Sequence, residues 1–128
     1  VTDVARLAGP DRFDVVFVFD AIHDQVQPEA VLSRIADLLV PGGLLFMREP
    51  HGADTLGGNL ANPMASIMYS ASTLHCLTVS LAHGGAGIGT VFGEQRARRM
   101  LADAGFAQPD VQPAPGTPLD AVYITRKA

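Results

Sequence analysis

The side chains of this sequence that could do acid–base chemistry gather just after a short apolar run. Residues 13–19 read FDVVFVF, and Asp20, His23 and Asp24 follow directly. A histidine ionises near neutral pH, so His23 is the best candidate for a general base that takes a proton from a substrate. The alternative is a structural histidine that bonds to the backbone. Asp24 is adjacent in the chain, and because adjacent side chains often diverge, the sequence alone does not establish a His–Asp dyad.

The apolar run predicts the element that positions these groups. Residues 13–19 are mostly apolar and are bounded by polar residues, which indicates a strand buried on both faces. Such strands belong mainly to parallel sheets covered by helices, so the run favours an α/β fold. Ligands of open α/β sheets bind beyond the carboxyl ends of the strands. Asp20 and His23 are at that end, and we expect the chemistry there.

A strand–helix–strand unit is predicted from the next segment. Apolar residues at helical spacing predict a helix over residues 28–39, and Pro41-Gly42-Gly43 is expected to stop it. Residues 44–47 are apolar and predict a second strand, adjacent and parallel to the first through a right-handed crossover. Further along, the pattern predicts a helix over residues 94–104, a short strand near Val111 and a final strand over residues 121–125.

The stretch of residues 55–93 contains no Asp, Glu, Lys or Arg. Apolar residues at helical spacing predict a helix over residues 64–82 within it. Its many Ser, Thr and His side chains argue against a membrane span. The segment is expected to be a buried amphipathic helix or, alternatively, the wall of an apolar substrate pocket or a subunit interface.

Composition limits the classes of function. A chain of 128 residues suits one domain, residues 1–128, and its formal net charge of −4 argues against a nucleic-acid or anionic-membrane surface. The single cysteine, Cys76, cannot form an internal disulfide and is expected to be a small buried apolar residue. We predict no metal site, and we expect a cytoplasmic protein because no signal segment is visible.

The order of these segments resembles the second half of a class I S-adenosylmethionine-dependent methyltransferase. The resemblance lies in FDVVFVFDAIHD, a helix, and then LLVPGGLLFMREP, followed by LADAGF, which is similar to the end of the last helix of that family. The segment STLHCLTVSLAHGGAGIGTVFGEQ resembles a subgroup of bacterial small-molecule methyltransferases. The resemblance implies a Rossmann-like α/β three-layer sandwich, a terminal antiparallel hairpin and S-adenosyl-L-methionine as cofactor.

The resemblance also suggests roles for individual residues. Asp20 and Ala21 match the loop that lines the methionine end of the cofactor, where a carboxylate could pair with the ammonium group. The alternative for Asp20 is a local turn or capping role. Asp3 matches an acidic position near the adenine amino group, which would make residues 1–4 the end of a strand. Glu49 either faces the methyl acceptor or is a solvated strand end.

One departure from the family pattern affects the predicted function. The chain has no GxGxxG loop, so we expect the N-terminal half of the domain, which carries that loop, to be missing. We therefore expect this chain alone to be inactive and to bind the cofactor weakly or not at all. The first hypothesis is a methyltransferase, or a fragment of one, that acts on a small apolar or aromatic acceptor. The alternative is a truncated, non-catalytic module that binds or dimerises. The expected partners of the chain are a small-molecule substrate and either a second copy of the chain or the missing half of the domain.

Overall fold

A four-stranded mixed sheet is the centre of the molecule. The computed structural model describes residues 3–10 and 12–128. The strands are β1 (Phe13–Phe19), β2 (Leu39–Pro50), β3 (Asp110–Pro113) and β4 (Asp120–Arg126), in the order β1-β2-β4-β3. β1 and β2 are parallel, whereas β4 runs antiparallel to both β2 and β3. This arrangement confirms the predicted parallel pair and the antiparallel terminal hairpin.

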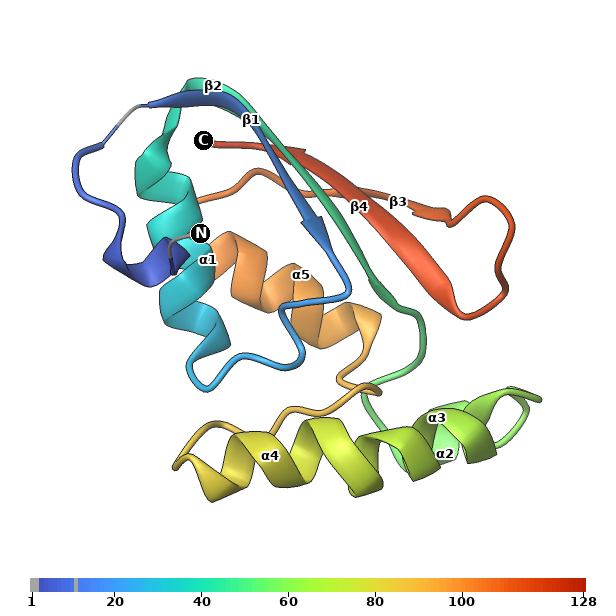
Figure 1. Ribbon diagram of the computed structural model, residues 1–128. Helices are drawn as coiled ribbons and strands as arrows, with labels where there is room; N and C mark the ends of the chain where they lie inside the picture. Colours follow the sequence, from blue (N-terminus) through green and yellow to red (C-terminus); the bar gives the residue numbers. More distant parts are fainter. Residues whose placement is uncertain (1–2, 11) are drawn as a thin grey trace.

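The helices fall into two groups, a layer on the sheet and a row across its end. The layer contains α1 (Pro28–Leu38) and α5 (Glu94–Asp103), which lie on the same face of the sheet (Figure 1). The row contains α2 (Leu56–Asn59), α3 (Ala65–Ala71), the π-helical segment η2 (Ser72–Cys76) and α4 (Leu77–Ala82). It crosses the end of the molecule at which β1 and β2 finish (Figure 1). The predicted helix 64–82 is therefore present, with a π turn in its middle.

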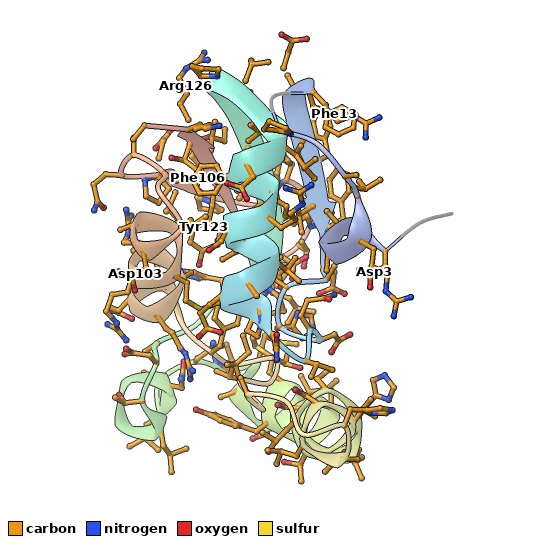
Figure 2. The ribbon with its side chains drawn as sticks, turned by 90° about the vertical axis from the view of Figure 1, so that its left-hand side faces the viewer. Asp3, Phe13, Asp103, Phe106, Tyr123 and Arg126 are labelled. Carbon is orange, nitrogen blue, oxygen red and sulfur yellow. The ribbon has the colours of Figure 1, made fainter. Side chains whose placement is uncertain are left out.

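The core lies between the sheet and the helical layer. Tyr123 of β4 is fully buried and points from the sheet toward α1 and α5 (Figure 2). Burying apolar side chains of this size is the main favourable term in folding. The other large core side chains from the two layers are Leu32, Ile35, Leu45, Met47, Met100 and Leu101.

The Pro41-Gly42-Gly43 segment differs from its prediction. We expected it to be the turn that stops the helix, but α1 ends at Leu38 and these residues already belong to β2. The pairing register between β1 and β2 shifts between Phe13 and Val15, opposite this segment, as at a β-bulge. Gly42 has φ +73°, a conformation that favours glycine, so the segment makes an irregular strand start rather than a separate loop.

The N-terminal strand prediction is wrong where the structure describes it. Val4 belongs to η1 (Val4–Arg6), a single 3₁₀ turn, and Val1 and Thr2 lie outside the described residues. The carboxylate of Asp3 caps this turn by accepting a hydrogen bond from the backbone N–H of Ala5 at 3.0 Å. A short polar side chain that satisfies the first free N–H group favours a helical turn over an extended strand.

The uncharged segment leaves the sheet and returns to it at one place. The backbone N–H of Glu94, at the start of α5, donates to the carbonyl of Gly52 at 3.0 Å. Glycine at position 93 is required there, because a Cβ on it would lie 2.3 Å from the backbone nitrogen of Asp54. Among the described residues, no helix is long and apolar enough to cross a membrane.

The second face of the sheet is bare along β1, which contradicts the prediction of a strand buried on both faces. Phe17 and Phe19 are 61% and 58% exposed, and of the residues of β1 only Val18 is buried. On this face the rings of Phe17 and Phe19 stack, and the ring of Phe46 lies tilted against both of them. β1 is also an edge strand. No described helix covers this face, so the chain supplies one helical layer of the expected three-layer sandwich.

We predict that the bare face of β1 makes the isolated chain self-associate. An exposed apolar edge strand pairs readily with another strand. Phe17→Lys combined with Phe19→Thr should shift sedimentation from dimers or larger species toward the monomer. The control is Ile67→Thr, which removes a similarly exposed side chain on α3, 60% exposed, and should change nothing. A dilute monodisperse wild-type monomer would contradict this prediction.

We predict that Tyr123→Phe does not lower the thermal stability. The Tyr123 hydroxyl is buried without a hydrogen-bond partner among the described residues, so its removal relieves a desolvation cost. The matched control in the same strand is Thr125→Val, which loses the 2.6 Å bond from Thr125 Oγ1 to the Ala107 carbonyl. Thermal unfolding should show an unchanged or higher Tm for the first variant and a loss of about 1 kcal/mol for the second. A large loss in Tyr123→Phe would show that the hydroxyl has a partner.

Candidate functional site

The site is organised by Glu49, a fully buried carboxylate at the end of β2. Glu49 Oε1 accepts hydrogen bonds from the backbone N–H groups of Ala21 at 2.9 Å and Ile22 at 2.7 Å. Its other oxygen, Oε2, lies 2.7 Å from Nδ1 of His23. A buried carboxylate needs such donors because desolvation otherwise disfavours its charged form. Glu49 therefore fixes the loop that follows β1 against the end of β2.

His23 is held between carboxylates. It is 3% exposed, with Nδ1 on Glu49 and Nε2 3.3 Å from Asp24 Oδ1. Burial lowers the pKa of His23, but the hydrogen bond and charge of Glu49, helped by Asp24 and Asp20, outweigh burial, so the pKa is raised above its ordinary value. The sequence did not establish a His–Asp pair, and the structure brings the two adjacent side chains together on the same side of the loop.

Asp20 turns the chain at the end of β1. Among the described residues that are not glycine, only Asp20 has a positive φ, +52°. Short polar residues such as Asp tolerate this left-handed conformation better than most. Partial burial raises the pKa of Asp20, with His23 opposing the shift and Glu49, Asp120 and Asp24 adding to it. The turn directs the chain from β1 into the loop held by Glu49.

A small apolar cavity lies beside this turn. Its volume is about 200 Å³, and its wall contains Asp20, Pro50, Ile67, Met68, Ala71, Thr90, Leu119 and Asp120. Asp120 is fixed by an ion pair with Arg48, in which Nη2 of Arg48 lies 2.7 Å from Oδ2 of Asp120. The wall combines both strand ends with α3 of the uncharged segment. The prediction of a buried amphipathic helix is wrong, because most side chains of residues 64–82 are exposed, whereas the substrate-pocket alternative stays a prediction. Asp20 lines the cavity, but His23 does not.

A second, more polar cavity of about 460 Å³ lies around the loop after β2. His51 and Glu94 both line it, with His51 Nε2 3.4 Å from Glu94 Oε2. Arg98 holds the other oxygen of Glu94 at 2.8 Å, and its hydrogen bond is the main reason that the pKa of Glu94 is lowered. This His–Glu–Arg chain was not predicted, because His51 and Glu94 are far apart in the sequence.

The predicted site residues thus divide into two places. Asp20, Ala21 and His23 meet around Glu49, whereas Asp3 lies with η1 beside α1 and points outward (Figure 2). Glu49 is the residue whose role the sequence did not reveal. Both roles considered for it, facing an acceptor or standing solvated at a strand end, required exposure, and the structure buries it completely.

Comparisons with known proteins agree with this architecture. Residues 1–47 match the family model described as a methyltransferase domain. The chain is similar in structure to the trans-methyltransferase CalH, which was solved in complex with SAH. The TM-score is 0.70 and the identity 22%, over 99% of this chain and 35% of CalH. The fold is that of a class I methyltransferase.

Other solved methyltransferases have the same fold. One is the Burkholderia thailandensis 1,6-didemethyltoxoflavin-N1-methyltransferase, with a TM-score of 0.63 and 20% identity over 99% of this chain and 49% of that one. Another, from Methanosarcina mazei, has a TM-score of 0.64 and 17% identity over 98% of this chain and 65% of that one. The chain therefore spans about a third to two thirds of these methyltransferases. No curated protein sequence matches it.

We predict that His23 makes the stability of this methyltransferase fold pH-dependent. Since its pKa is raised in the folded state, its contribution is fully present below the ordinary value of 6.5 and is lost as the pH rises through the higher folded value. Tm should therefore fall from pH 6 to pH 9 in the wild type, and the fall should be smaller in Glu49→Gln. His51→Gln is the control and should retain the wild-type slope. A wild-type slope in Glu49→Gln would contradict the assignment.

Proposed function

We propose that this chain is the C-terminal part of an S-adenosylmethionine-dependent methyltransferase that methylates a small molecule. The observation that carries the proposal is the family match over residues 1–47, which contains Asp3, Asp20, Ala21 and His23 and ends within β2. The fold and the position of these groups beyond the ends of parallel strands support it.

Asp20 is proposed to contact the methionine end of the cofactor. Its carboxylate is exposed on the cavity wall, and its pKa is raised mainly by partial burial. A cationic ammonium group beside it would favour the charged form. Ala21 would contribute the shape of the loop, since Glu49 already holds its N–H. Asp3 stays a prediction for the adenine end, and its present contact is the cap of η1.

The acceptor is proposed to be small and apolar or aromatic. The cavity beside Asp20 is lined mainly by apolar side chains, including Pro50, Ile67 and Met68, and holds about 200 Å³. Methyl transfer from a sulfonium depends largely on positioning the two reactants, which such a wall can do by shape. One methyltransferase of the same fold holds 1,6-didemethyltoxoflavin and S-adenosylhomocysteine.

The general-base role of His23 stays a prediction from the sequence. What supports it is the orientation by Glu49, which leaves Nε2 as the atom that could take a proton. In the complete enzyme, His23→Ala should then lower turnover more than cofactor affinity. The cytoplasmic location also stays a prediction.

A second candidate function is a non-catalytic module with the methyltransferase fold that binds a partner chain. The exposed aromatic rings of Phe17 and Phe19 on the edge strand favour it. Two apolar grooves, of about 230 and 260 Å³, run along β1 on the α1 side. The partner would be a second copy or the missing half of the domain. Co-expression with the N-terminal half of a related methyltransferase tests this reading, because a stable complex would cover this surface.

We predict that the chain binds S-adenosylhomocysteine weakly and through Asp20. The contacts of a glycine-rich loop are missing from the chain, so Kd should lie between about 1 µM and 1 mM, about −8 to −4 kcal/mol. Asp20→Asn should weaken binding, whereas Asp14→Asn, an exposed carboxylate on β1, should not. Ligand-observed NMR and titration calorimetry measure both.

Two outcomes would contradict this prediction. Binding tighter than about 1 µM would mean that the missing contacts are replaced within the chain. Absence of binding at millimolar ligand, or equal effects of the two variants, would remove the support for a cofactor site at Asp20.

A further inference from the structure

Three metal-ligating side chains meet behind the loop that follows β1. The donor atoms of His23, Asp24 and Cys76 all lie within 4.8 Å of one another. His23 and Asp24 belong to the β1–α1 loop, and Cys76 is the last residue of η2, more than fifty positions away in the chain. We propose that these residues bind a divalent transition-metal ion of the zinc class. The prediction of no metal site considered neighbours in the sequence, and this group comes from two distant segments.

The orientation of His23 supports the proposal. A metal-bound histidine usually donates its other ring N–H to a carboxylate, which fixes the ring and raises its basicity. Glu49 Oε2 lies 2.7 Å from Nδ1 and is itself fully buried, so Nδ1 is already occupied. The lone pair of Nε2 is thereby directed toward Asp24. A carboxylate–imidazole–metal arrangement would therefore form without any movement of the His23 ring.

The spacing of the His23 and Asp24 donors fits one small ion. For zinc bound tetrahedrally at ordinary Zn–N and Zn–O distances, two ligand atoms lie about 3.4 Å apart. The Nε2 atom of His23 and Oδ1 of Asp24 are 3.3 Å apart. A thiolate, an imidazole and a carboxylate form a mixed donor set that suits zinc better than magnesium or calcium, which prefer oxygen ligands. Three protein ligands leave one position for water.

Cys76, the last residue of the π-helical segment, lies near a buried hydroxyl group. Thr90 Oγ1 is buried without a hydrogen-bond partner in the described residues. It lies close enough to Cys76 to act on the pKa of the thiol, which burial raises and Thr90 opposes. A thiolate at this position would give that hydroxyl an acceptor.

The local charge also favours a cation. The carboxylates of Glu49, Asp24 and Asp20 all act on His23, which leaves an excess of negative charge around one imidazole. An ion would compensate this charge. The ion and a transferred proton would use the same lone pair of Nε2, so a metal-bound His23 does not act as the general base.

The test uses Co²⁺ as a spectroscopic probe of the reduced chain, with Zn²⁺ as competitor. Cys76 is the only cysteine, so a thiolate-to-cobalt charge-transfer band and the reaction rate of the thiol with a chromogenic aromatic disulfide both report on this site alone. We expect one Co²⁺ per chain, a charge-transfer band that Zn²⁺ removes by displacing the cobalt, and slower thiol modification with either ion. Asp24→Asn and Cys76→Ser are near-isosteric, and each should weaken binding by about 10-fold or more.

The matched control is His75→Gln, which removes an exposed histidine next to Cys76 and should leave binding unchanged. Circular dichroism of each variant shows whether the fold is retained. The proposal is overturned if the band is absent and both ions leave thiol modification unchanged. It is also overturned if Asp24→Asn retains the fold and binds Co²⁺ as well as the wild type does. None of these readouts depends on methyl transfer, so the proposed function and the metal site can fail separately.

Discussion

The hydrogen bonding of Glu49 is the constraint on which the rest of the site depends. A carboxylate with no exposed surface is costly unless donors surround it. Here the donors are the backbone of the β1–α1 loop and the ring of His23. The loop keeps its shape because Glu49 holds it, and Glu49 is tolerated because the loop supplies the donors. These hydrogen bonds set the turn at Asp20, the orientation of His23 and the approach of Asp24.

The elements of the fold were largely predictable, because they depend on short-range patterns. Apolar runs gave β1 and the centre of β2, and helical spacing gave α1 and α5 to within a residue. The start of β2 was missed because Pro41-Gly42-Gly43 is compatible both with a turn and with a bulged strand. The strand expected at residues 1–4 was wrong because Asp3 caps η1. A local polar contact of this kind is not visible in a pattern of apolar residues.

The site was predictable only in part, because its main contacts join distant segments. The position of Asp20 and His23 beyond a strand end follows from the topology of α/β sheets. Their connection to Glu49 depends on the register of β1 and β2, in which Phe19 pairs with Arg48 and the next residues face each other across the strand ends. From the sequence, Glu49 was expected either to face the acceptor or to be solvated at the strand end, because its buried hydrogen-bond donors come from a loop far away in the chain. Cys76 meets this loop from a distant π-helical segment, which no residue pattern indicated.

The hydrogen bond between Glu94 and Gly52 has a consequence for how such proteins diverge. The segment between these two residues starts and ends at one place in the fold. Gly93 lies at its end, where there is no room for a larger residue. Ile88 and Phe92, near its end, belong to the hydrophobic core, so the part before them can change in length and sequence without altering the strands or the helical layer. The same segment forms one wall of the apolar cavity and contains Cys76, which lies behind the β1–α1 loop. Grafting a different segment between positions 52 and 88 would exchange this wall of the cavity as one unit, while Ile88, Phe92 and the sheet stay in place.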